Sequence, residues 1–121
     1  MRWVTADTRR AILKVQLALH NVMRYAPRMI ASFRDKEAAT IWEGRRSRRL
    51  PGDIQVVALR KLRMLNNARR LADLRIPPAN RLEALRGNRS GQHSIRINDQ
   101  WRVCFIWREG HAHEVEIADY H

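Results

Sequence analysis

The chain has 121 residues, enough for one domain with a single core, and its 45% hydrophobic content excludes an intrinsically disordered protein. No apolar run approaches the roughly 20 residues of a membrane span, and the single cysteine, Cys104, excludes an internal disulfide and fits a reducing cytoplasm. Lysine and arginine total 24 against 12 acidic residues, a net charge of +12, and only Lys14, Lys36 and Lys61 are lysines. Arginine binds phosphate with a planar, two-pronged fork, so the composition favours a nucleic-acid partner over a surface kept basic for solubility.

The first 28 residues differ from the rest, with six basic residues and one acid, Asp7. Thr8 is placed to cap a helix that Pro27 would end. Three interpretations are open for residues 1–28: an arginine-rich targeting peptide, an added helix packed on the domain, or a mis-assigned start before a domain that begins at Met29.

A short strand is expected from Met29 to Phe33. Asp35 follows as the cap of a helix that continues to about Glu43 and is closed by Gly44. Next comes a basic loop, Arg45-Arg46-Ser47-Arg48-Arg49, in which Arg45 and Arg46 are candidate contacts to an RNA backbone. The alternative is an ordinary solvated loop.

The longest helix is expected from Ile54 to about Asn67, after a turn and cap at residues 51–53. Its apolar positions have helical spacing, and its opposite face carries three basic residues. The apolar positions are Ile54, Val57, Ala58, Leu62 and Leu65, and the basic ones are Arg60, Lys61 and Arg63.

Four strands follow in the second half of the chain. A first strand is expected at residues 82–85, a turn-rich connection at 87–91, and three further strands near 93–97, 101–107 and 113–117. One strand, two helices and a meander of strands predict an α+β domain, a small antiparallel sheet with two helices packed on one face.

The hairpin around Asn98-Asp99-Gln100 allows a register to be worked out. If these three residues form the loop, Ile97 faces Trp101, and the apolar side chains of both strands share one side, which is the core. Arg96 and Arg102 then face each other on the other side. A two-residue loop would mix the faces, so the three-residue register is preferred.

Two arginines facing each other repel, at a cost of up to about 1 kcal/mol. An anion bound between Arg96 and Arg102 would turn this unfavourable interaction into a favourable one, which makes the pair a candidate phosphate site. The structural alternative is that either arginine pairs with Glu83, Glu114 or Glu116.

The chain ends in Asp119-Tyr120-His121. Histidine can take and give a proton near neutrality, and tyrosine can stack on a base or donate a hydrogen bond. Metal-free RNA cleavage needs a base for the ribose 2′-hydroxyl, an acid for the departing 5′-oxygen and fixed cations at the phosphate. The facing arginines, Tyr120 and His121 supply all three if the last strand ends beside the hairpin.

No metal or cofactor site is expected. His111 and His113 are two residues apart and could share a strand face, but no third ligand is apparent, so a solvated hairpin is favoured. Cys104 falls on the side of Arg96 and Arg102 and is not expected to be a nucleophile.

The second half of the chain resembles the HigB toxins of the RelE-like family. The resemblance rests on the Leu-basic-Gly step at residues 85–87, the strand Ser94-Ile-Arg-Ile-Asn98, the strand Trp101-Arg-Val-Cys-Phe105 and the Asp119-Tyr120-His121 ending. An opening typical of the family, Met29-Ile-Ala-Ser-Phe-Arg-Asp-Lys36, precedes them. The resemblance covers residues 29–121, which favours Met29 as the true start.

This resemblance implies a RelE-like fold and a toxin of a type II toxin–antitoxin system, a cytoplasmic, ribosome-dependent endonuclease that cuts messenger RNA and inhibits translation. It also implies inhibition by a HigA-like helix-turn-helix antitoxin, through which the complex would bind operator DNA. The implied phosphate-site residues are Arg86, Arg96, Asn98 and Arg102, with Tyr120 and His121 for proton transfer and base stacking. We add Arg89 to the candidate RNA contacts.

Two other functions are compatible with the same fold. ParE-like toxins poison DNA gyrase by binding protein, and a third possibility is a catalytically inactive RNA-binding module. The hairpin arginines and the Tyr120-His121 ending favour a nuclease.

Overall fold

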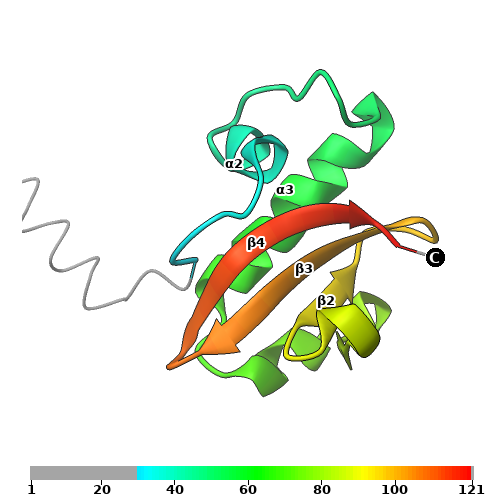
Figure 1. Cartoon of the computed structure of the whole chain (residues 1–121). Coiled ribbons are helices and arrows are strands. Elements are labelled where there is room, and N and C mark those ends of the chain that lie inside the picture. Colours follow the sequence, from blue (N-terminus) through cyan, green and yellow to red (C-terminus); the bar gives the residue numbers. More distant parts are fainter. Residues whose placement is uncertain (1–29, 121) are drawn as a thin grey trace, which may run out of the picture.

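A computed structural model of the chain describes residues 30–120 (Figure 1). Two helices, α2 (Lys36–Trp42) and α3 (Gly52–Asn67), precede an antiparallel sheet with the strand order β1-β2-β3-β4. The strands are β1 (Glu83–Ala84), β2 (His93–Arg96), β3 (Trp101–Arg108) and β4 (His111–Asp119), and short 3-10 turns η1 (Leu71–Arg75), η2 (Pro78–Asn80) and η3 (Gly87–Arg89) lie between α3 and β2. No helix among residues 30–120 is long and apolar enough to cross a membrane. The interpretations of residues 1–28 lie outside the described part of the chain.

Both helices cover the same face of the sheet, which confirms the α+β prediction. Figure 1 shows α3 passing behind β3 and β4, whereas η3 lies in front of β2. The core lies between helices and sheet, where Ile54, Ala58, Leu62 and Leu65 of α3 are buried with side chains of α2 and all three long strands. The expected apolar stripe of α3 is therefore confirmed, with Val57 partly buried at its edge.

α2 begins and ends as the sequence predicts. The Asp35 side chain accepts a hydrogen bond from the backbone N–H of Ala38 at 2.9 Å, which satisfies a free donor of the first turn. Past the last turn, Gly44 adopts φ +82°, a left-handed conformation that costs glycine little.

Two expectations for α3 are wrong. The helix starts at Gly52, ahead of Asp53, and its N-cap residue, Pro51, makes no side-chain hydrogen bond, so Asp53 lies in the first turn instead of capping it. Lys61, expected on the solvated face, is buried and donates a hydrogen bond to Asn80 Oδ1 at 2.5 Å. That acceptor comes from η2, 19 residues further along the chain.

The strand expected at residues 29–33 is reduced to two isolated bridges parallel to β4, Ile30 with Ala112 and Phe33 with Val115. Backbone hydrogen bonds from Ala31 to Ala112 (2.7 Å) and from Arg34 to Val115 (2.9 Å) attach this segment to the sheet edge. It leads the chain directly into α2.

A β-bulge in β4 keeps the core continuous. Cys104 pairs with Glu116 but Ile106 pairs with His113, so β4 contains one extra residue at this point. Glu114, with φ +50°, lies in the bulge. As a result, Ala112 and Val115 are both buried against the helices although they are three residues apart.

Candidate active site

The face of the sheet opposite the helices, here called the open face, carries the predicted hairpin pair. Arg96 and Arg102 are direct partners across β2 and β3, as are Ile95 and Val103. The backbone N–H of Ile97 donates to the carbonyl oxygen of Trp101 at 2.9 Å, which closes a loop of residues 98–100. The three-residue register predicted from the sequence is therefore confirmed.

Arg102 is buried beneath this face and held by several partners. Its Nε donates to Ser94 Oγ at 2.7 Å, and a terminal nitrogen donates to the Arg81 carbonyl at 2.5 Å. Glu83 Oε1 lies 3.7 Å from the same Nε, and the guanidinium lies 6.0 Å from the centre of the Tyr120 ring. Glu83 was one of the three partners expected from the sequence, so the structural alternative for Arg102 is realised.

Arg96 lies nearer to solvent and forms an ion pair with Asp99 in the hairpin loop. Asn98 closes that loop, because its Oδ1 accepts hydrogen bonds from the backbone N–H groups of Gln100 and Trp101, both at 2.8 Å. The Asn98 oxygen is thus occupied by the turn, which leaves the side-chain amide nitrogen as the group for an RNA contact.

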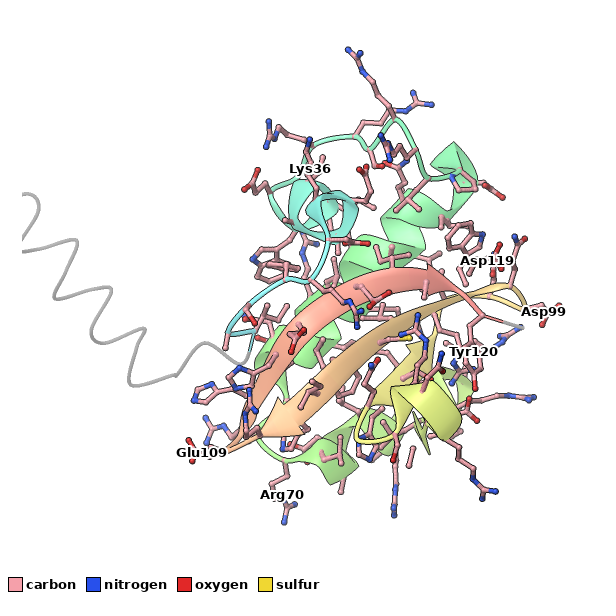
Figure 2. The ribbon with its side chains drawn as sticks, in the orientation of Figure 1. Lys36, Arg70, Asp99, Glu109, Asp119 and Tyr120 are labelled. Carbon is pink, nitrogen blue, oxygen red and sulfur yellow. The ribbon has the colours of Figure 1, made fainter. Side chains whose placement is uncertain are left out.

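The last strand ends beside the hairpin, the condition on which the predicted site depends. Asp119 pairs with Trp101, and the backbone N–H of Tyr120 donates to the Gln100 carbonyl at 2.8 Å. Figure 2 shows Tyr120 at the same end of the sheet as Asp99 and Asp119. The Tyr120 ring packs on a small buried cluster of Leu85, Cys104 and Ala118. His121 lies outside the described residues.

An open cleft of about 560 Å³ lies between the segment 83–86, which includes β1, and Tyr120, just past the end of β4. Its lining combines cationic, acidic and phenolic side chains: Glu83, Ala84, Leu85, Arg86 and Tyr120. Arg86 is exposed at the start of η3. The structure therefore brings Arg86, Arg102 and Tyr120 together, with Arg96 alongside Arg102 on the neighbouring strand.

Arg89 lies on the open face but is engaged by the protein. It donates to Glu116 Oε1 at 3.3 Å and to Gln92 Oε1 at 3.0 Å. Arg34 reaches Glu116 Oε2 at 3.3 Å from the other side. Two cations therefore share one largely buried carboxylate next to Cys104.

Cys104 has no access to solvent, and burial raises the pKa of its thiol to about 11. A thiol in this state is a poor nucleophile. His111 and His113 have ring centres 6.4 Å apart, and no group of three metal ligands occurs among residues 30–120.

Arg45 and Arg46 are not part of the cleft. They belong to the connection between α2 and α3, which lies beyond the β4 edge of the sheet and away from β2 and η3 (Figure 1). The cleft is lined by Glu83, Ala84, Leu85, Arg86 and Tyr120. Arg45 forms an ion pair with Glu43. Any contact these arginines make with RNA therefore involves a second surface.

Glu83 is the cleft residue that the sequence analysis considered only as a structural partner. Its place follows from strand alternation, because Glu83 faces Ser94, and Ser94 lies on the same side as Arg96. Recognising it from sequence requires the pairing of a two-residue strand, which periodicity cannot supply.

Comparison with known proteins agrees with this geometry. The family model described as "RelE-like toxin of type II toxin-antitoxin system HigB" matches residues 31–121. Toxin HigB-1 of Vibrio cholerae serotype O1 is 44% identical over 85 residues, which cover 69% of this chain and 90% of that protein. An uncharacterized protein of Haemophilus influenzae is 33% identical over 67 residues, 55% of this chain and 66% of the relative. With its α+β fold and this match over most of its length, the chain belongs to the HigB family of RelE-like toxins of type II toxin–antitoxin systems.

Proposed function

We propose that this toxin is an endoribonuclease that cuts messenger RNA on the ribosome and so inhibits translation, without a metal ion in the chemical step. The observation that carries the proposal is the backbone hydrogen bond from Tyr120 to Gln100, which fixes the end of β4 beside the arginine hairpin. The phenol of Tyr120 and the guanidinium of Arg86 then line one cleft large enough for a nucleotide, with Arg102 6.0 Å from the Tyr120 ring and Arg96 facing Arg102 across the hairpin.

The cations are suited to a phosphodiester. Charge develops on the nonbridging phosphate oxygens as the 2′-oxygen attacks, and donors fixed in advance stabilise it without reorganisation. Arg86 lines the cleft, while Arg102 is held rigidly by Ser94 and Arg81. Arg96 adds a third cation from the facing strand. Asn98 remains a candidate RNA contact at the edge of this site, whereas Arg89, expected from the sequence to contact RNA, is engaged by Gln92 and Glu116.

Proton transfer requires a base and an acid within reach of the phosphate. Among the residues that line the cleft, Glu83 has the only carboxylate, and 47% of its side chain is exposed. We assign to Glu83 the acceptance of the 2′-hydroxyl proton. Tyr120, with the predicted help of His121, stacks on a base and supplies a proton to the departing 5′-oxygen.

Single-turnover cleavage of message on programmed ribosomes tests this proposal. Because the ribose 2′-oxygen is the nucleophile, a single 2′-deoxy nucleotide at the cut site should block cleavage while ribosome binding is kept. Glu83→Gln should slow cleavage by about 10²-fold or more while ribosome binding is kept. Glu109→Gln, the same change in an exposed turn, is the control. Cleavage of the 2′-deoxy message at the normal rate would refute the mechanism.

The proposed partners follow from the family. A type II toxin pairs with an antitoxin, and we propose that this one is a HigA-like helix-turn-helix protein that also carries the complex to operator DNA, in the cytoplasm. Co-expression with the neighbouring gene product should neutralise toxicity. Growth arrest by the wild-type protein without message cleavage would instead favour a protein target such as gyrase.

A further inference from the structure

The four arginines of the α2–α3 connection lie on a loop that the protein holds in a defined conformation. Ser47, between the two arginine pairs, is buried. Its hydroxyl donates to Glu37 Oε1 at 2.5 Å and accepts from the backbone N–H groups of Arg49 (3.2 Å) and Leu50 (3.3 Å). A solvated basic loop would not need such an anchor.

Gln55, in the first turns of α3, ties the loop to the helix. Its Oε1 accepts from the Ser47 N–H at 2.9 Å, and its Nε2 donates to the carbonyls of Ser47 and Leu50, both at 2.9 Å. The loop therefore has fixed backbone hydrogen bonds on both sides of Ser47, while Arg45, Arg46, Arg48 and Arg49 are exposed around it.

The loop also carries three arginines without a carboxylate partner in the described part of the chain, whereas most arginines of the open face are paired. On the open face, Arg34 and Arg89 pair with Glu116, Arg96 with Asp99, and Arg102 with Glu83. In the loop, Arg45 pairs with Glu43, whereas Arg46, Arg48 and Arg49 form no ion pair with any of residues 30–120. Arg46 lies against Gly52 at the start of α3, whose helix dipole is positive at that end.

We propose that this anchored loop is a second RNA-docking surface, which binds the phosphate backbone of ribosomal RNA while the cleft holds the message. Exposed, preordered guanidinium groups fit phosphate oxygens in two-pronged fashion at low entropic cost. The loop lies beyond the β4 edge of the sheet and contributes no residue to the cleft, so one RNA strand need not occupy both (Figure 1). The inference rests on the proposed ribosomal function only for the identity of the RNA.

The test compares two double variants with the same loss of charge. Arg48→Gln/Arg49→Gln removes loop cations, and Arg69→Gln/Arg75→Gln removes two exposed arginines that follow the end of α3 in the chain. Binding of each full-length protein to intact programmed ribosomes is measured over a range of salt concentrations, and cleavage is measured at saturating ribosomes.

We expect Arg48→Gln/Arg49→Gln to weaken ribosome binding about tenfold at roughly 0.15 M salt and to lower the slope of log Kd against log salt by about 1.4 to 1.8, the value for two phosphate contacts. The cleavage rate at saturation should not change. Equal effects of both double variants, or loss of antitoxin binding with ribosome affinity intact, would overturn the proposal. Wild-type protein that binds ribosomes without cutting message would refute the proposed function and leave the docking surface standing.

Discussion

Replacement of Arg102 by alanine sets two opposing effects against each other. The variant relieves the repulsion between Arg102 and Arg96, which would stabilise the fold by up to about 1 kcal/mol. It also removes the hydrogen bond to Ser94, whose side chain is fully buried, and the one to the Arg81 carbonyl. The balance of these two effects decides whether the Arg102 side chain destabilises or stabilises the folded domain.

The structure favours destabilisation. A hydrogen bond from a charged donor contributes about 1.5 to 3 kcal/mol, and Ser94 cannot replace its partner with bulk water, whereas the exposed Arg81 can. Loss of the buried aliphatic part of Arg102 under Tyr120 adds about 1 kcal/mol. After subtraction of the relieved repulsion, the free energy of unfolding should fall by about 1.5 to 3 kcal/mol, equivalent to roughly 6 to 20 °C in Tm for a domain of this size.

Urea and thermal unfolding followed by tryptophan fluorescence measure this effect, with Arg96→Ala as the control. That variant relieves the same repulsion but loses only the ion pair with Asp99, which is 99% exposed, so its Tm should stay near that of the wild type. Both variants should lose cleavage activity, since each removes a phosphate cation. If Arg102→Ala is as stable as Arg96→Ala, the buried bonds of Arg102 contribute nothing and the reasoning is refuted.

Three further predictions concern stability and reactivity. Asn80→Ala should lower the free energy of unfolding by about 2 to 4 kcal/mol, because it leaves buried Lys61 without its acceptor and frees the Leu74 carbonyl; a loss below 1 kcal/mol in urea unfolding would contradict this. Burial lowers the pKa of His93 from 6.5. The neutral His93 side chain therefore contributes fully to the free energy of unfolding above pH 6.5, and this contribution is lost as the pH falls from there toward the lowered folded-state pKa. Tm measured over this range should drop in the wild type more than in His93→Phe, and parallel curves would count against it. Cys104, with its buried thiol and pKa of about 11, should resist iodoacetamide at pH 8 in the native protein and react after unfolding, as intact mass would show; native labelling would disprove its burial.

The sequence predicted the hairpin well because strand alternation and loop length together allow a single register. Moving Arg96 and Arg102 off the open face would have placed isoleucines in solvent, so the pattern excluded other pairings. The helix ends were also predictable where a local cap determines them, as at Asp35 and Gly44. These features depend on residues within a few positions of one another.

What could not be predicted depends on contacts between distant residues. Lys61 was expected in solvent because helical periodicity groups it with its exposed neighbours Arg60 and Arg63. Its hydrogen-bond acceptor, Asn80, is 19 residues away, and periodicity carries no information about so distant a contact. Likewise, the carbonyl of Arg81 reaches Arg102 across 21 residues. The short strand β1, which places Glu83 in the cleft, has only two residues and therefore no periodicity.

The carboxylates on the open face divide its arginines into two groups, which leads to a final prediction. Glu116 is 14% exposed and holds Arg34 and Arg89, so Arg89 should be part of the structural frame. Arg86 lines the cleft, and no ion pair joins it to any of residues 30–120, so it is free to meet a phosphate. We expect Arg89→Gln to lower stability by about 1 to 2 kcal/mol with little change in cleavage rate. Arg86→Gln should do the reverse, with cleavage reduced about 10²-fold and Tm unchanged. Urea unfolding and single-turnover cleavage of both variants measure the two quantities, and a larger loss of cleavage in Arg89→Gln than in Arg86→Gln would show that the buried pair, and not the exposed cation, faces the RNA.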